Sequence, residues 1–333
     1  MPNNQKELKI VEPSDSLSDK LRAEIKRVMR AMFFDPLMSE FKAIQNNATS
    51  KSKLVRKIES GSLQYVGGAF TGKLDAATGK SLKELGAKFD KRRRGWVIAE
   101  PRLPADLQEA VRKQVKAREA LEQAARESIA SISKRAQEMI PRLDLDPYAG
   151  ATEDDVDDKV LASLADEISV QPKLSRDQKA EMRKAYTENV KLSIVGFIDD
   201  EVNRFRKSVL PKIRDGMDRV QLREYVQSRL KVSDTRARFI ARQETALFTS
   251  HQKQLLYLDA GVTQYKWRAI GGKAGDGRTR DSHAEAHGKI FYWDKDKGPN
   301  GALKPRNGEG NTVNPGEDFG CRCQAVPIVD RII

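Results

Sequence analysis

The chain has 333 residues, of which 38% are hydrophobic, 33% charged and 6% aromatic, and its formal net charge is +13. That length suggests about two domains, and many charges with few aromatics favour long amphipathic helices over one dense sheet. No stretch approaches the roughly 18 consecutive apolar residues of a membrane-spanning helix, and the N-terminus has no apolar signal segment. Two cysteines exclude a disulfide scaffold. We therefore expect a soluble, intracellular protein that does not contact a membrane.

The positive charge is concentrated in the first half of the chain. Residues 51–118 hold 17 Lys and Arg against 7 Asp and Glu, whereas residues 271–333 hold 10 against 9. The densest basic run consists of Lys91, Arg92, Arg93 and Arg94. Two interpretations stay open, a solvated surface or a patch that faces the phosphates of double-stranded DNA without reading its sequence.

Residues 1–60 are predicted to be a mainly helical N-terminal region. Apolar residues recur at helical spacing over residues 17–45, and Asp35-Pro36 is expected to open a second turn or helix. Residues 46–60 are polar and loop-like at first and weakly helical afterwards.

Residues 61–104 are predicted to form a small, basic β-α-β insert. The run "LQYVGGAFTGK" indicates a strand and a Gly-rich turn, "GKSLKELGAKF" a helix, and "RRGWVIAEPRLP" a second strand. Its core is expected to be closed by four aromatic residues, Tyr65, Phe70, Phe89 and Trp96.

The middle of the chain is predicted to be helical, with one linker. Residues 105–140 form a long helix with Ala and Leu on one face and mixed charges opposite. Residues 141–158 are rich in Pro, Gly and Asp and are expected to be an acidic linker. Helices then continue over residues 159–232. Breaks are expected at Pro or Gly, near Pro172, Pro211 and Gly216.

Residues 233–333 are predicted to be an α+β domain. Ser233 is a suitable N-cap and Gly261 a suitable C-terminal glycine for one helix, whose apolar side also carries Glu244 and His251. Three short strand-like runs follow it. The fold class is therefore mainly α, with a small α+β C-terminal domain, a helix packed on a short antiparallel sheet, and a small α/β insert near residues 63–103.

Four motifs in this domain occur together, "IARQE", "DGRTRDSHAEAHGKIF", "NPGED" and "CRC". In order and spacing they resemble the phage Mu F-like minor head proteins of the head morphogenesis family. The resemblance covers residues 235–329. It is carried by Ile240, Ala241, Arg242, Glu244, Trp267, Asp276, Arg278, Thr279, Arg280, His283, His287, Gly288, Pro315, Cys321, Arg322 and Cys323.

The resemblance implies a structural protein of a tailed phage or prophage, not an enzyme. It implies a place in the phage head near the portal vertex, reached from the host cytoplasm during assembly, with the portal protein and the major capsid or scaffolding protein as partners. The chain departs from the family pattern at Gln243, where Thr is common. It departs again at Asp318-Phe319-Gly320, where the family often has His-Pro, which removes one potential metal ligand.

The residues themselves leave three kinds of site open. His283, His287, Cys321 and Cys323 supply two nitrogens and two sulfurs, a set suited to tetrahedral zinc, although Cys-x-Cys is tighter than the usual ligand spacing. No other cofactor is expected. A second interpretation is a buried polar network that locks the sheet to its helix. Its members would be Arg242, Glu244, His251, Asp276, Arg278 and Arg280.

The third interpretation is catalytic. A metal-dependent or ribonuclease-like nuclease could use Glu285, His283 or His287 as general acid and base, with an arginine as phosphate clamp. This alternative predicts that replacing either histidine abolishes activity but leaves the fold intact.

Overall fold

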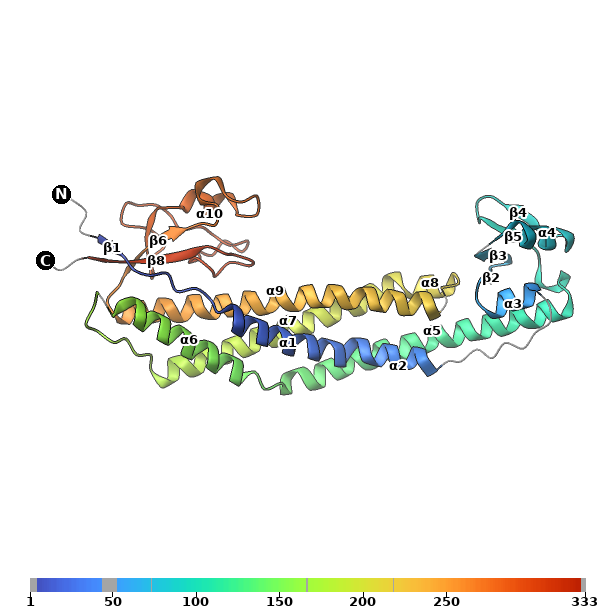
Figure 1. The fold of residues 1–333 in the computed structure, drawn as a ribbon, viewed down its shortest axis with the longest axis horizontal. Helices are drawn as coiled ribbons and strands as arrows, with labels where there is room; N and C mark the ends of the chain where they lie inside the picture. The colour runs from blue at the N-terminus through green and yellow to red at the C-terminus, as the bar shows by residue number, and fades with distance from the viewer. Residues whose placement is uncertain (1–4, 44–52, 73, 166, 218, 331–333) are drawn as a thin grey trace. The chain divides into compact units, whose positions relative to one another are not determined.

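The computed structural model describes residues 5–43, 53–72, 74–165, 167–217 and 219–330 (Figure 1). The chain divides into two compact units. We call Met1–Arg27, Pro141–Ile194 and Asp234–Ile333 the terminal unit, and Val28–Ile140 and Val195–Ser233 the central unit. The predicted fold class is confirmed, because the chain is mainly helical with two small antiparallel sheets, one of them near the C-terminus.

The N-terminal helices follow the prediction. Helix α1 (Asp15–Met29) leads through a π-helical turn (Arg30–Phe34) into α2 (Asp35–Ala43). The turn directly precedes Asp35-Pro36, where the missing N–H of the proline removes one helical hydrogen bond. Residues 44–52, part of the predicted N-terminal region, lie outside the described residues.

The insert has a different topology from the predicted β-α-β unit. Two hairpins flank one helix and form a four-stranded antiparallel sheet in the order β2-β3-β5-β4. The difference arises because the sequence on each side of the helix folds back on itself, at a two-residue Gly67-Gly68 turn and at Lys91–Arg94. The elements are β2 (Leu63–Val66), β3 (Ala69–Gly72), α4 (Ala76–Glu84), β4 (Lys88–Asp90) and β5 (Gly95–Val97).

The core of the insert extends beyond its predicted bounds. Helix α3 (Lys53–Glu59) and the first turns of α5 (Ala105–Met139) pack on this sheet (Figure 1). Tyr65 and Phe70 are buried as predicted, whereas Phe89 is 52% exposed and rests edge-on against Trp96. Helix α5 itself matches the predicted long helix. It is followed by a 3-10 turn (Ile140–Arg142).

The predicted acidic linker is wrong. Residues 146–158 belong to helix α6 (Asp146–Leu164), which runs on to Leu164. Asp146 and Pro147 suit the first turn of a helix, where a proline needs no N–H partner and a carboxylate faces the positive end of the dipole. Ala149, Val156 and Val160 are fully buried at helical spacing, and this apolar side is what makes the acidic segment a helix.

The predicted breaks at Pro172, Pro211 and Gly216 are confirmed, but the predicted helix start at Ser233 is wrong. Helix α9 runs from Arg219 to Asp259 without interruption. Ser233 lies within it, and its hydroxyl donates to Leu230 O at 2.7 Å, a bond that allows serine inside a helix. Upstream of it lie α7 (Arg176–Ser208) and α8 (Leu210–Arg214).

At its C-terminus α9 ends as predicted. Gly261 N–H donates to Leu258 O and Val262 N–H to Tyr257 O, the pair of bonds that closes a Schellman motif.

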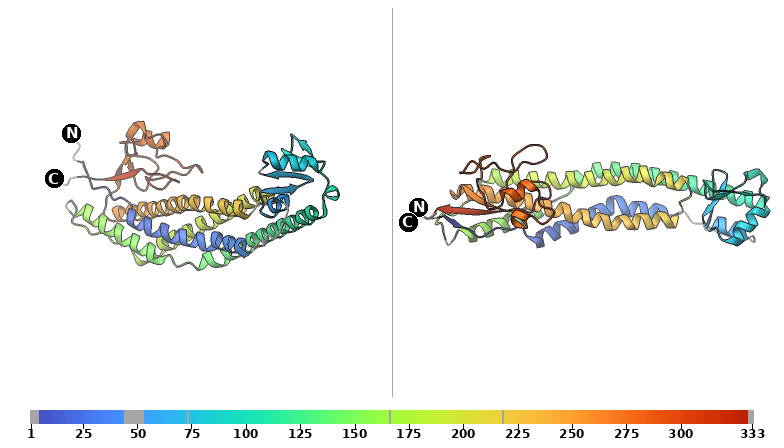
Figure 2. Two further views of the ribbon diagram at one scale, coloured as in Figure 1. Left: turned by 45° about the vertical axis from the view of Figure 1, so that its right-hand side comes forward. Right: turned by 90° about the horizontal axis from the view of Figure 1, so that it is seen from above.

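The sheet of the terminal unit has four antiparallel strands in the order β1-β8-β6-β7. The three strands predicted near the C-terminus are present, as β6 (Gln264–Arg268), β7 (Ile290–Tyr292) and β8 (Gln324–Asp330). The fourth, β1 (Gln5–Glu7), comes from the start of the chain and lies alongside β8 (Figure 2). Its short polar sequence gave no strand signal.

Aromatic side chains connect this sheet to α9. Tyr257 of α9 stacks on Trp293 with ring centres 6.0 Å apart. The ring centre of Tyr265 of β6 lies 4.4 Å from that of the same indole. Trp267 and Phe291 complete this fully buried group. Within the described ranges, no helix combines the length and the apolar character that crossing a membrane requires.

Candidate functional site

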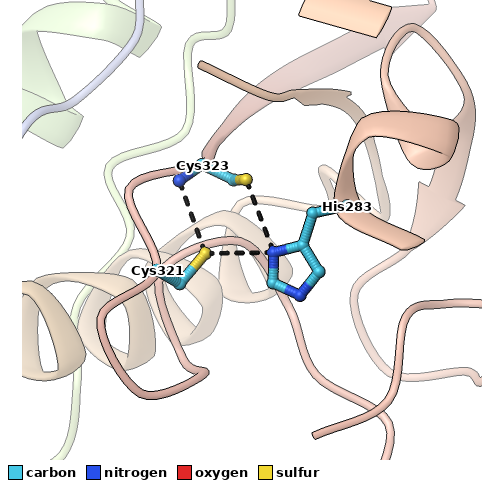
Figure 3. Close-up of side chains that lie close together, drawn as sticks. All are labelled: His283, Cys321 and Cys323. Carbon is cyan, nitrogen blue, oxygen red and sulfur yellow. Dashed lines mark hydrogen bonds between the residues drawn. The ribbon is translucent and has the colours of Figure 1, made fainter. Parts of the chain in front are cut away.

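Three of the four predicted metal ligands come together in the terminal unit (Figure 3). His283 Nδ1 lies 3.5 Å from Cys321 Sγ and 3.6 Å from Cys323 Sγ. All three donor atoms lie within 4.8 Å of one another. The imidazole is almost completely buried, at 1% exposure, and both thiols are nearly so. We call these residues the Cys-His cluster.

Local structure explains how the cluster forms. Cys321 and Cys323 directly precede β8, in a segment without regular secondary structure that follows a turn closed by Cys321 N–H donating to Asp318 O at 2.9 Å. The backbone N–H of Cys323 also donates to Cys321 Sγ at 3.4 Å. His283 projects from the short helix α10 (Asp281–Ala286), and its ring packs edge-on against Trp267 of β6, 5.2 Å away.

The loop that carries the "DGRTR" motif is tied to the "CRC" segment by an ion pair. Asp276 Oδ1 accepts hydrogen bonds from the backbone N–H groups of Arg278 and Thr279, and Asp276 Oδ2 accepts one from Arg322 at 2.5 Å. The Arg322 guanidinium, as the strongest influence, lowers the pKa of the Asp276 carboxyl well below its usual range. The pair therefore holds the loop against the backbone between the two cysteines.

A second ion pair supports the histidine. Arg280 Nη1 lies 3.1 Å from Asp318 Oδ2, and Arg280 Nη2 donates to Phe319 O at 2.7 Å. The same Asp318 oxygen lies 3.5 Å from His283 Nε2, the ring nitrogen that faces away from the sulfurs. Sequence reasoning noted Asp318 only as a departure from the family pattern. Its contact with His283 spans 35 positions, so no local pattern could reveal it.

The pKa values of the two thiols are shifted in opposite directions. The hydrogen bond from Cys323, with a further contribution from His283, lowers the pKa of Cys321. The pKa of Cys323 is raised, because it donates to Cys321 and is buried. Backbone and side-chain donors around Cys321 thus favour a thiolate at that position.

The fourth predicted ligand, His287, is directed elsewhere. Its Nδ1 accepts the backbone N–H of Ala269 at 3.1 Å, which fixes the end of β6 beside the helix α10. His287 is the C-cap residue of α10, so the four-residue spacing from His283 does not place both rings on one helical face. Its role in the structure is a backbone contact.

The predicted buried polar network is replaced by separate contacts. Glu244 is buried, but Arg242, His251, Asp276, Arg278 and Arg280 are exposed. Arg280 pairs with Asp318 and not with Glu244. Asp276 pairs with Arg322 and accepts the backbone N–H of Thr279.

Glu244 lies instead at a cavity of about 270 Å³ in the terminal unit. Tyr186, Phe248, His251 and Glu317 also line it. Ser193 Oγ donates to Glu244 Oε1 at 3.4 Å, and burial raises the pKa of Glu244 to about 7.

The four residues predicted to face DNA form the turn between β4 and β5, and all four side chains are exposed. Asp90 Oδ1 accepts the backbone N–H groups of Arg92 and Arg93 at 2.8 and 3.2 Å, and Arg93 Nη1 donates to Gly67 O at 2.8 Å. These bonds order the turn. We call Lys91–Arg94 the basic turn.

Fold and site define a mainly helical protein whose small α+β unit contains a buried cluster of two cysteines and a histidine. Residues 203–326 match the family model described as Phage Mu protein F like protein, so this part of the chain is Mu F-like, as its motifs predicted. The match begins upstream of the predicted domain, within α7. A Mu F-like region suggests a role in phage head morphogenesis.

A relative matches part of the chain. It is an uncharacterized protein of Haemophilus influenzae (strain ATCC 51907 / DSM 11121 / KW20 / Rd), 28% identical over 153 residues. The match covers 44% of this chain and 30% of that protein, so the similarity is confined to one region of each. No solved structure matches the chain.

Proposed function

We propose that this chain is a minor head protein of a tailed phage or prophage, which associates with the portal vertex during head assembly. The observation that carries the proposal is the Mu F-like match over residues 203–326. The contacts around the Cys-His cluster support a structural rather than a catalytic use of the motifs. His283 is enclosed by Trp267 and both cysteines, and His287 is bonded to backbone.

Quantitative mass spectrometry of purified particles, and of portal complexes isolated from induced or infected cells, tests this function. We expect the chain at a few copies per particle or in association with the portal. If it is found in neither, the minor head assignment is wrong. If the chain were a nuclease, the wild type would cleave DNA or RNA and the variant His287→Ala would lose that cleavage.

The basic turn is the part of the chain that we propose contacts packaged DNA. Exposed guanidinium groups on an ordered turn can approach phosphates with little loss of conformational freedom. The segment around the turn, residues 51–118, also holds the largest excess of Lys and Arg, 17 against 7 acidic residues. Such a surface binds duplex DNA without sequence preference.

Reversing the charge of this turn should weaken DNA binding. The salt dependence is the slope of log K, the logarithm of the DNA association constant, against log salt concentration. For the variant Arg92→Glu/Arg93→Glu/Arg94→Glu we expect the magnitude of this negative slope to be smaller by about 2–3. Binding of a duplex without sequence bias would be measured by fluorescence anisotropy at several salt concentrations.

A matched variant controls for net charge. Arg206, Lys207 and Lys212 are exposed helical residues of the same central unit, outside residues 51–118, and changing all three to Glu alters the net charge equally. This control should retain most of the original slope. Equal losses in the two variants would show that overall charge, and not the basic turn, attracts the DNA.

A further inference from the structure

We propose that His283, Cys321 and Cys323 bind one zinc ion through His283 Nδ1 and the two sulfurs. The inference is independent of the assembly role, because it rests on the geometry of the Cys-His cluster alone.

The distances between the donor atoms fit such an ion. A tetrahedral zinc has Zn–S bonds of about 2.3 Å and Zn–N bonds of about 2.0–2.1 Å, which places a nitrogen and a sulfur ligand about 3.5–3.6 Å apart. The two nitrogen–sulfur distances in the cluster are 3.5 and 3.6 Å. One ring nitrogen therefore lies almost equally far from both sulfurs, as a shared ion requires, and the measurements below separate this from two S–H···N hydrogen bonds.

The surroundings of the three donors resemble those of a zinc site. A zinc-bound histidine usually directs its other ring nitrogen toward a carboxylate, which fixes the ring and its tautomer. Asp318 Oδ2 lies 3.5 Å from His283 Nε2 and is itself held by Arg280. Neither His283 Nε2 nor Asp318 Oδ2 makes a hydrogen bond in this structure, although both atoms are buried. A proton on Nε2, which zinc on Nδ1 requires, would lie close to that carboxylate.

The donor types select the metal. Two thiolates and one imidazole favour zinc over magnesium or calcium, which prefer oxygen ligands. Among the residues that the structure describes, no fourth His, Cys, Asp or Glu joins the group.

The test uses the full chain, purified without chelator from zinc-supplemented cells. Elemental analysis should find about one zinc per chain, and His283→Ala or Cys323→Ser should reduce it at least tenfold. His287→Ala, whose ring is bonded to Ala269, should keep the full amount. For Asp318→Asn we expect unchanged stoichiometry at saturation and roughly 10–100-fold weaker zinc affinity.

A second measurement does not depend on whether the variants fold. In the wild-type chain stripped of metal, one equivalent of zinc should protect both thiols from a disulfide reagent, and magnesium should not. Cobalt in place of zinc should give thiolate-to-metal charge-transfer absorption. Absence of zinc together with absence of protection would overturn the proposal. So would a native mass lower by two hydrogens, since the cysteines would then form a disulfide.

Discussion

The variant Arg229→Met is expected to destabilise the central unit by about 3–5 kcal/mol, because it leaves a buried carboxylate without its main partner. Glu201 of α7 is 3% exposed. Arg229 of α9 donates two hydrogen bonds to its carboxylate, from Nε to Oε2 at 2.9 Å and from Nη2 to Oε1. Arg204 is the other cation nearby, but its Nε lies 3.7 Å from Oε1, and its side chain is 55% exposed. It can replace only part of the interaction.

Hydrogen exchange read by mass spectrometry on peptides from residues 195–233 would measure the loss in opening free energy. Arg206→Met, an exposed change on the same helix as Glu201, should stay within about 0.5 kcal/mol of the wild type. The double variant Glu201→Leu/Arg229→Met should recover most of the stability, because a buried pair can be replaced by packed apolar groups. Unchanged protection in the single variant would mean that water reaches Glu201.

The sequence predicts those elements whose signals come from residues close together in the chain. The length of α5, the C-terminal end of α9 and the three strands near the C-terminus each follow from spacing or from a terminal glycine. Errors came where two local signals competed. The acidic composition of residues 146–158 indicated a linker, but the buried spacing of Ala149, Val156 and Val160 prevailed.

The candidate site divides in the same way. Residue type alone singled out His283, Cys321 and Cys323, and the structure brings these three together. A four-residue spacing such as that of His283 and His287 puts two rings on one face only inside a helix, and α10 ends at Ala286, before the second histidine. Pairs such as Asp276 with Arg322 connect loops 46 positions apart, and only the sheet topology decides such contacts.

The variant Glu244→Gln is expected to stabilise the terminal unit by up to about 3 kcal/mol above pH 8 and hardly at all near pH 4. Burial raises the pKa of this carboxyl to about 7 in the folded chain, compared with about 4.3 when it is exposed. Between these two values the folded state holds a proton that the unfolded state has released. The stability of the wild type therefore falls as the pH rises from about 4.5 to 7, and the fall ends once Glu244 is ionised in both states.

Glutamine keeps the shape of the protonated acid but cannot ionise, so it should remove this part of the pH dependence. Urea unfolding at several pH values, followed by fluorescence in a Trp96→Phe background, would report on Trp267 and Trp293, the tryptophans of the terminal unit. Glu188→Gln, an exposed change on α7, should leave the pH profile unaltered. If the profiles of Glu244→Gln and the wild type ran parallel from pH 4 to 8, Glu244 would be ionised in the folded chain, with its charge compensated by water in the cavity that it lines.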